Sequence, residues 1–328
     1  MMAYEREKQV AIAAATSAAS LCEQVRKYST LAAIEKQDRS PVTIADLGAQ
    51  AVICRAIALA FPTDAIVAEE DASLLRQPAM AECLDAVTTY VRAEVPDATP
   101  EAVTTWIDRG QGNVGSRYWT LDPIDGTKGY LRGDQYAIAL ALIEAGEVKL
   151  GVMACPALPV AATQPDGERG VLFVAVRGQG TTLISLEDSS SKVVHVVSGE
   201  DISYLPSTES VESRHGNLPL QRAIAQAVGL SAPPLQMDSQ AKYGAVARGE
   251  AALYLRLPWA EFPDYRENIW DHAAGAIVVE EAGGRVTDMD GKPLDFTSGS
   301  KLINNRGIIA SNGSLHQLVL AALRQSQY

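Results

Sequence analysis

The chain has few cysteines and no cysteine pair at the spacing of a metal or redox motif. Its four cysteines, Cys22, Cys54, Cys83 and Cys155, are far apart, and each lies in an apolar run. A disulfide framework or a zinc ribbon needs close and regular spacing, whereas isolated apolar cysteines are usually buried free thiols. We therefore expect reduced cysteines in a reducing compartment, which favours a cytoplasmic location.

Long apolar runs are also missing. No segment approaches the roughly 18 uninterrupted apolar residues that a membrane span needs. The first ten residues, MMAYEREKQV, place charges where a signal peptide has its apolar core. The sequence contains no internal repeat and no long low-complexity tract. We expect no membrane partner, and we expect a monomer.

Basic residues are outnumbered. There are 28 Lys and Arg against 40 Asp and Glu, a net charge of −12. A protein that follows nucleic-acid polymers needs a positive face, so the balance disfavours that class of partner. A small anionic substrate stays compatible, because bound metal ions and a few local cations can reverse the field inside a cleft. The length of 328 residues, 47% hydrophobic and 21% charged, allows one large or two ordinary globular domains.

The strongest chemical signal is the stretch Trp119-Thr-Leu-Asp-Pro-Ile-Asp-Gly-Thr-Lys-Gly-Tyr-Leu131. Its aromatic and β-branched start predicts a strand, which we expect to end at Asp122-Pro123 because proline has no donor for a sheet ladder. Asp122 and Asp125 would lie at the carboxyl end of that strand, and a helical turn near Thr127 would direct free N–H groups to the same place. This arrangement combines hard oxygen ligands for Mg²⁺ with an amide cradle for a phosphate. The alternative is an Asp-Pro turn whose second Asp caps the next helix.

Two more acids stand at predicted element ends in the first part of the chain. Asp46 follows Thr43, which we expect to cap a helix that runs to Phe61-Pro62. Its simple interpretation is a first-turn carboxylate beside the helix dipole. Glu69 follows a short buried strand, Ala65–Ala68, and an acid-rich segment there is usually a solvated loop. Both positions could also deliver a carboxylate to the site at Asp122.

A second motif, Ile269-Trp-Asp-His-Ala-Ala-Gly-Ala-Ile-Val-Val-Glu-Glu-Ala-Gly-Gly284, predicts a helix with Asp271 in its first turn and a glycine stop. Its small residues suit close packing against another element, and a capping aspartate on a core helix is the ordinary alternative. If Glu69, Asp122, Asp125 and Asp271 converge, they would repel one another too strongly to stay ionised without cations. Two or three Mg²⁺ ions would supply the charge and could clamp the oxygens of a phosphoryl transfer.

The rest of the chain predicts alternating helices and strands around a boundary near Pro156 and Pro159. We expect an N-terminal α+β domain over residues 1–158 and a C-terminal α/β domain over residues 159–328, which contributes Asp271. The predicted helical segments are 4–34, an insertion over 72–109 with joints at Pro78, Pro96 and Pro100, then 220–228 and a helix after Lys242 that ends near Arg248. The predicted strands are 136–143, 148–154, 171–176, 181–186, 193–197, 235–237 and 252–257.

Asp122-Pro-Ile-Asp-Gly-Thr127 and Trp270-Asp-His-Ala-Ala-Gly275 resemble the two signatures of the inositol monophosphatase and fructose-1,6-bisphosphatase superfamily of lithium-sensitive, Mg²⁺-dependent phosphatases. Further segments resemble its 3′(2′),5′-bisphosphate nucleotidase branch, and the likeness covers roughly residues 5 to 312. These segments are Ser40-Pro-Val-Thr43 with Asp46, Trp119–Gly133, Asp238-Ser-Gln-Ala-Lys-Tyr243, Tyr254-Leu-Arg-Leu-Pro258, Asn268–Gly275 and Pro293-Leu-Asp-Phe296.

This resemblance implies an α/β fold, a layered αβαβα sandwich of the inositol monophosphatase type, with metals between the two domains. By this resemblance, the metal ligands are Glu69, Asp122, the Ile124 carbonyl, Asp125 and Asp271. It makes Asp46 and Thr127 the pair that orients and deprotonates the attacking water. It places the phosphate on the amides of Gly126 and Thr127, and the nucleotide on His215, Ser239, Lys242 and Arg256.

Each nucleotide contact also has an ordinary explanation. His215 could be a loop histidine, Ser239 a helix cap, and Lys242 and Arg256 solvated surface charges. The resemblance implies a small-molecule nucleotide substrate, 3′-phosphoadenosine 5′-phosphate, hydrolysed to AMP and phosphate, with 3′-phosphoadenosine 5′-phosphosulfate as a second substrate. The rivals are an inositol polyphosphate 1-phosphatase and a catalytically silent metal or nucleotide sensor.

Overall fold

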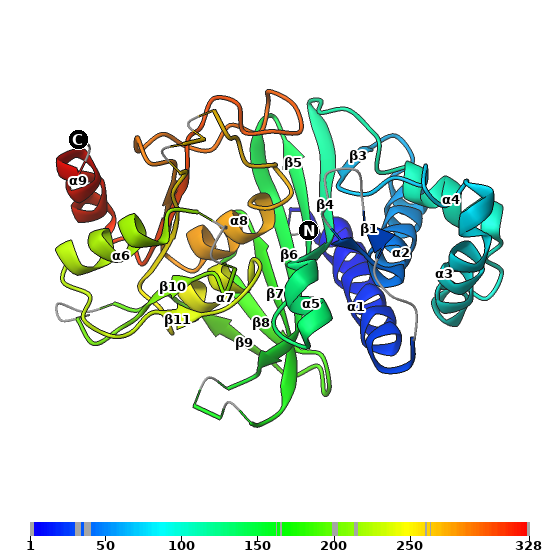
Figure 1. Ribbon diagram of the computed structural model, residues 1–328, viewed down its shortest axis with the longest axis horizontal. Coiled ribbons are helices and arrows are strands. Elements are labelled where there is room, and N and C mark those ends of the chain that lie inside the picture. Colours follow the sequence, from blue (N-terminus) through cyan, green and yellow to red (C-terminus); the bar gives the residue numbers. More distant parts are fainter. Residues whose placement is uncertain are drawn as a thin grey trace.

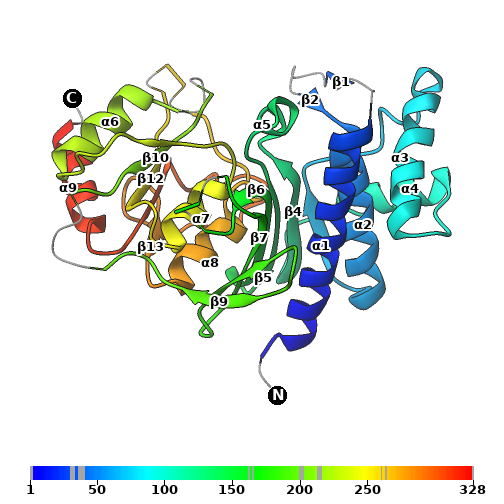
Figure 2. The same cartoon turned by 90° about the horizontal axis from the view of Figure 1, so that it is seen from below.

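The computed structural model of the chain describes residues 3–29, 34–35, 41–161, 163–164, 166–198, 203–212, 216–259, 261–262 and 264–326. Its helices and sheets are stacked in alternating layers (Figure 1). A helical layer covers one face of a seven-stranded sheet, a second helical layer covers the other face, and a five-stranded sheet with outer helices follows (Figure 2). The predicted αβαβα layering is therefore confirmed.

The seven-stranded sheet is the centre of the molecule. Its strand order is β3-β4-β5-β6-β7-β8-β9, with β3 parallel to β4 and every other pair antiparallel. The middle strands are buried along almost their whole length because helices cover both faces of the sheet. The strands are β3 (Ala65–Ala68), β4 (Arg117–Asp125), β5 (Ala137–Glu144), β6 (Glu147–Pro159), β7 (Arg169–Val176), β8 (Thr181–Ser185) and β9 (Ser191–Val194).

The expected hairpin about residues 144–147 is present as β5 and β6. The strand expected at 193–197 begins and ends earlier, as β9. The larger sheet continues from β6 into β7, across residue 158. The division of the chain into two domains at that residue stays a prediction.

The first helical layer consists of α1 (Glu5–Tyr28) and α2 (Ile44–Ala60), which pack against each other. The buried stripe of α1 is rich in alanine, which lets the two helices approach closely. The helix expected over residues 4–34 ends at Tyr28, because Ser29 already has an extended backbone; residues 30–33 lie outside the described part of the chain. A short sheet of β1 (Ile34–Glu35) and β2 (Pro41–Val42) precedes α2.

The expected helical insertion over residues 72–109 forms three helices on the outer side of α2 (Figure 1). They are the 3₁₀ helix η1 (Pro78–Met80), α3 (Ala81–Glu94) and α4 (Pro100–Asp108). Pro78 and Pro100 each open a helix, where a missing N–H has no consequence. Thr99 caps α4 by accepting a hydrogen bond from the Ala102 amide at 3.2 Å.

The second helical layer, α7 (Ala241–Ala247) and α8 (Ala273–Glu281), lies between the two sheets. The smaller sheet has the order β11-β10-β12-β14-β13, and α6 and α9 pack together beyond it. Its elements are β10 (Ser207–Glu209), α6 (Leu218–Ala227), β11 (Leu235–Gln236), β12 (Leu253–Arg256), β13 (Arg285–Thr287), β14 (Ile308–Ser311) and α9 (His316–Ser326).

All four cysteines are free, and Cys22, Cys54 and Cys155 are fully covered, as expected for apolar thiols. Cys83 is half-buried on α3. None of the described helices combines the length and the apolar character needed to cross a bilayer.

The contact between α8 and the large sheet depends on Gly151 of β6. A Cβ at this position would lie 2.4 Å from Cγ2 of Ile277 and 2.9 Å from the Ala274 carbonyl oxygen, both on α8. Gly151→Ala should therefore lower the free energy of unfolding by about 1–3 kcal/mol, since overpacking pushes α8 off the sheet. Urea unfolding followed by circular dichroism measures the change.

Gly115→Ala is the matched control, because no atom lies within 4 Å of the added Cβ and its φ is not positive. Its free energy of unfolding should stay equal or rise slightly. Equal stability of the two variants would contradict the close packing of α8 on β6.

Candidate active site

The carboxyl end of β4 carries the two aspartates of the first motif. The strand was expected to end at Asp122-Pro123, but it continues to Asp125. The pairing register shifts between Asp122, opposite Ala139, and Asp125, opposite Ala137, so β4 carries one extra residue. This bulge removes the proline from the ladder and turns the strand end. The Asp122 carboxylate accepts a hydrogen bond from the Ile124 amide at 3.1 Å, which fixes it within the bulge.

The predicted helical turn after the aspartates is present as α5 (Thr127–Arg132), with Gly126 as its N-cap at a left-handed φ of 87°. Glycine is suited to this position because a side chain there would be strained. The space is also taken, since a Cβ on Gly126 would lie 3.0 Å from Cβ of Ser239. The α5 start therefore lies directly beside the Asp238-Ser239 turn of the C-terminal half.

Asp46 is both a helix cap and a partner of the α5 start. Its Oδ2 accepts hydrogen bonds from the amide and hydroxyl of Thr43, at 2.7 and 2.5 Å, and completes the capping box of α2. Its Oδ1 lies 3.3 Å from the hydroxyl of Thr127, which also lies 3.2 Å from the Ile124 carbonyl. Asp46 can therefore cap α2 through Oδ2 and contact Thr127 through Oδ1, so the cap interpretation and the catalytic interpretation are compatible. Asp46 is fully buried and lies behind Thr127.

A cleft of about 540 Å³ lies where β4, α5 and the segments before α7 and α8 meet. Acids from both halves of the sequence and three basic residues, Lys128, Lys242 and Arg256, line it. The predicted site residues on its lining are Glu69, Asp122, Ile124, Asp125, Gly126, Thr127, Ser239, Lys242, Arg256 and Asp271.

Asp271 reaches the cleft from a turn and not from a helix. It was expected in the first helical turn, but α8 begins only at Ala273. The amides of His272 and Ala273 both donate to the Ile269 carbonyl, at 3.3 and 3.0 Å, which forms a tight turn. Asn268 Nδ2 donates to Asp271 Oδ2 at 3.2 Å and orients the carboxylate within that turn.

Burial and mutual repulsion raise the pKa of three of the acids in the cleft. Burial raises the pKa of Asp122 well above its usual range, and the charges of Glu69, Asp125 and Asp271 raise it further. Burial and the charge of Asp125 likewise raise the pKa of Asp271 well above its usual range. Burial raises the pKa of Asp125 too, although Lys242 opposes the shift. Hard carboxylate oxygens that repel one another in a wet cleft fit the ligand chemistry of Mg²⁺.

Lys242 and Arg256 also line the cleft; Lys242 is buried, and 18% of the Arg256 side chain is exposed. Burial lowers the pKa of Lys242 to about 8, although the Asp125 charge opposes this. Arg256 Nε donates to Glu267 Oε1 at 2.8 Å. Burial alone would raise the pKa of Glu267, but Arg256 and His272 outweigh it and lower the pKa to about 2.

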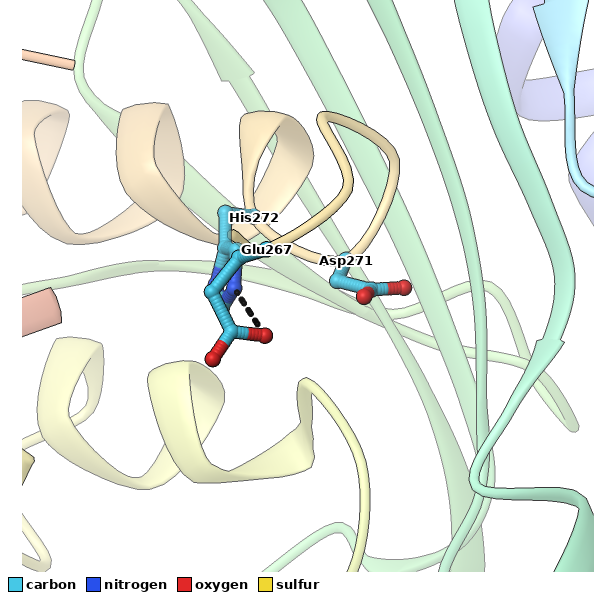
Figure 3. Close-up of side chains that lie close together, drawn as sticks. All are labelled: Glu267, Asp271 and His272. Atoms are coloured by element: carbon cyan, nitrogen blue, oxygen red, sulfur yellow. Dashed lines mark ion pairs between the residues drawn. The ribbon is translucent and has the colours of Figure 1, made fainter. Parts of the chain in front are cut away.

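Glu267, Asp271 and His272 lie close together at the start of α8, and Glu267 faces the imidazole (Figure 3). The distance from His272 Nε2 to Glu267 Oε2 is 3.5 Å, and His272 Nδ1 lies 2.8 Å from the hydroxyl of Tyr243. This chain of contacts runs from α7 to Arg256 and holds the guanidinium on the cleft wall.

Ser239 has a left-handed backbone, φ 66°, which is rare for a residue with a side chain. Its hydroxyl accepts a hydrogen bond from the Ala241 amide at 3.2 Å, but the N-cap of α7 is Gln240, so Ser239 lies in the turn before the helix and is not its cap. His215 lies outside the described residues.

Two cleft residues, Gln240 and Glu267, were missed in the sequence. Both stand inside or beside motifs that were recognised, Asp238–Tyr243 and Asn268–Gly275. Gln240 is an uncharged side chain and gives no chemical signal by itself. Glu267 is one acid in an acidic chain, and only its three-dimensional contact with Arg256 distinguishes it from a solvated surface residue.

A model of the inositol monophosphatase family matches residues 4–328 of the chain. A 3′(2′),5′-bisphosphate nucleotidase of Emericella nidulans is 41% identical over 350 aligned residues, covering 99% of both chains. The 3′(2′),5′-bisphosphate nucleotidase 1 of Arabidopsis thaliana is 45% identical over 348 aligned residues, covering 99% of this chain and 97% of the relative.

Solved structures show the same fold. The inositol monophosphatase of Thermotoga maritima superposes with a TM-score of 0.65 at 23% identity, covering 96% of this chain and 95% of that one. The inositol monophosphatase of Anabaena gives a TM-score of 0.63 at 20% identity, covering 99% and 97%. With its layered fold, its acidic cleft and a family match over residues 4–328, the chain belongs to the inositol monophosphatase family.

Proposed function

We propose that the chain is a Mg²⁺-dependent phosphatase that removes the 3′-phosphate of a 3′,5′-bisphosphate nucleotide, 3′-phosphoadenosine 5′-phosphate, and yields AMP and phosphate. One observation carries this proposal: the acids at the end of β4 and before α8 meet in a single cleft that Lys242 and Arg256 also line. The acids suit cations, and the two basic side chains suit an anion. Full-length relatives that carry the name 3′(2′),5′-bisphosphate nucleotidase support the choice of substrate.

Two or three Mg²⁺ ions held by Glu69, Asp122, Asp125, Asp271 and the Ile124 carbonyl would offset the charge of the phosphate oxygens and favour an in-line attack by water. The chain's own contribution begins at Thr127 and Asp46. The hydroxyl of Thr127 lies between the Asp46 carboxylate and the Ile124 carbonyl, so it can accept a proton from water and pass its own to Asp46. The free amides at the start of α5, at Gly126 and Thr127, suit the phosphate oxygens.

Selectivity for a second phosphate would come from Lys242 and Arg256. Glu267 fixes Arg256 through Nε, and the guanidinium lines the cleft, where its planar group of N–H donors suits a phosphate. Lys242, with a pKa of about 8, stays mostly charged at neutral pH. A nucleotide that carries a 5′-phosphate away from the acids would be bound by both Lys242 and Arg256. The second substrate, 3′-phosphoadenosine 5′-phosphosulfate, would present a similar charge to these side chains.

Phosphate release at equal substrate concentration tests the proposal. With Mg²⁺ present, the 3′,5′-bisphosphate nucleotide should be hydrolysed much faster than AMP, which has no 3′-phosphate, and faster than inositol 1,4-bisphosphate. Chelation of the metal should stop the reaction. Faster release from the inositol ester would indicate an inositol polyphosphate 1-phosphatase, and binding without release from any substrate would indicate a silent sensor.

Asp46→Asn separates the capping role of Asp46 from its proposed catalytic role. An amide can still accept from Thr43, so the variant should lose no more than about 1 kcal/mol of stability. Turnover should fall by roughly two to four orders of magnitude, because an amide cannot take a proton from Thr127. A thermal melt and a rate measurement on the same sample give both numbers.

Thr99→Ala is the matched control for the loss of a cap, since Thr99 caps α4 away from the cleft. It should lower the melting temperature and leave turnover unchanged. If Asp46→Asn lowers the melting temperature in the same way with a normal rate, Asp46 is only a cap.

Arg256→Gln should weaken the binding of the bisphosphate nucleotide more than the binding of a 3′-monophosphate. Only the bisphosphate loses a charged partner for its second phosphate. Since the single change leaves Glu267 buried without its cation, the double variant Arg256→Gln, Glu267→Gln is measured beside it. We expect KM for the bisphosphate to rise about 10- to 100-fold in the double variant, as for the loss of one charged bidentate contact.

Arg222→Gln provides the control, because Arg222 pairs with Glu209 outside the cleft lining. It should leave KM for both substrates unchanged. An equal rise of KM for the bisphosphate and the monophosphate in the double variant would show that Arg256 does not bind the second phosphate.

A further inference from the structure

Gln240, the last residue before α7, connects the two acid-bearing segments of the cleft. It is 2% exposed and uses both its backbone and its side chain. Its backbone amide donates to Asp125 Oδ2 at 2.6 Å. Its side-chain Nε2 donates to the Trp270 carbonyl at 2.9 Å, and its Oε1 accepts from the Gly275 amide at 3.0 Å. One residue thus holds the end of β4 and the start of α8.

The two side-chain bonds lie on either side of Asp271. Trp270 is the residue before it, and Gly275 is the third residue of α8, where a helical N–H has no partner within the helix. His272, the N-cap of α8, gives no side-chain cap. Gln240 therefore supplies the cap from another element, and it fixes the turn that carries Asp271.

A side-chain amide at this position meets two requirements at once. The Trp270 carbonyl needs a donor and the Gly275 amide needs an acceptor, and both must be reached from one side-chain end. A carboxylate has no donor, and an apolar side chain would leave two buried backbone groups without partners. These two partners also fix the orientation of the Gln240 side-chain amide. The Trp270 carbonyl can only accept a hydrogen bond, and the Gly275 amide can only donate one.

The turn that contains Gln240 is itself held rigidly. Ser239 has a left-handed backbone at φ 66°, and Asp238 forms an ion pair with Arg132 of α5. The Asp238 side chain also lies against Gly129 of α5, where an added Cβ would come within 3.0 Å. The position of Gln240 is therefore set from the β4–α5 side, and its side chain transmits that position to α8.

We propose that Gln240 is a positioning residue that fixes the spacing between the carboxylates of Asp125 and Asp271, and so sets the affinity of the cleft for Mg²⁺. This inference rests on the proposed function, in which both acids hold metal. The backbone bond to Oδ2 would orient Asp125, and the two side-chain bonds would orient Asp271. Partners that orient metal-binding side chains typically change metal affinity by about 10- to 100-fold when they are lost.

The test compares Mg²⁺ binding in two variants and a control by titration calorimetry. Gln240→Met keeps the side-chain length and removes both side-chain bonds, and Gln240→Asn keeps the amide but is too short to reach both Trp270 and Gly275. Each should raise the Mg²⁺ dissociation constant by about 10- to 100-fold. The Mg²⁺ concentration for half-maximal turnover should rise by a similar factor, and excess Mg²⁺ should restore most of the rate.

Asn305→Leu is the matched control. Asn305 is also a buried side-chain amide with bonds to two backbone groups, Pro293 O at 2.9 Å and Asp295 N at 2.7 Å, but it does not line the cleft. It should lower the melting temperature and leave Mg²⁺ affinity within about twofold of wild type, since it contacts no cleft carboxylate. This contrast separates positioning from a general loss of stability.

Folded Gln240 variants with wild-type Mg²⁺ affinity would overturn the inference, and so would an equal loss of affinity in Asn305→Leu. If Gln240→Met does not fold, Gln240→Asn decides the question by itself. Wild-type protein that binds Mg²⁺ but hydrolyses no bisphosphate nucleotide would contradict the proposed function, and the calorimetric comparison would still decide the role of Gln240.

Discussion

The mutual repulsion of buried carboxylates at the end of β4 is the constraint on which the rest of the structure depends. Asp122 and Asp271 come from segments about half the chain apart, and the charge of Asp271 raises the pKa of Asp122. Apolar packing alone would favour keeping them apart. The fold instead fixes each one in a bulge or a turn with a dedicated hydrogen bond, from the Ile124 amide to Asp122 and from Asn268 to Asp271. In this arrangement the carboxylates repel one another, and a bound cation can offset that repulsion.

The layered fold is what allows this concentration of charge. The β4 bulge and the α8 turn line the same cleft because the helical layer of α7 and α8 is pressed between two sheets. Small residues make that pressing possible. Gly151 lets α8 approach β6, and Gly275 lets α8 approach α7, where a Cβ would lie 2.3 Å from the Tyr243 ring. The same closeness brings Gln240 within reach of both acid-bearing segments.

Much of this could be predicted from the sequence, because the acids stand in short motifs with strong turn signals. The Thr43–Asp46 capping box, the Asp-Pro-Ile-Asp-Gly-Thr segment and the elements of the helical insertion are local features, and local sequence determines them. The family match confirmed the resemblance that those motifs carried.

What could not be predicted depends on contacts between distant segments. The strand β4 continues past Pro123 because a register shift against β5 absorbs one residue, and no local pattern specifies that shift. Asp271 lies before α8 because the Ile269 carbonyl closes a turn first. The pairing of Glu267 with Arg256 and the three bonds of Gln240 exist only once β12, α7 and α8 are assembled.

The most direct measurement is the thermal stability of metal-free protein, with and without added Mg²⁺, at about pH 4.5, just above the ordinary pKa of Asp, and at about pH 8. The cleft acids have raised pKa values, so their protonated forms favour the fold, and that stability is lost as the pH rises through the folded-state pKa values. Mg²⁺ should therefore raise the melting temperature more at the higher pH, and its binding should release protons at the lower pH. An absence of Mg²⁺ binding, or an equal stabilisation at both pH values without proton release, would contradict a cleft whose acids are assembled to hold cations.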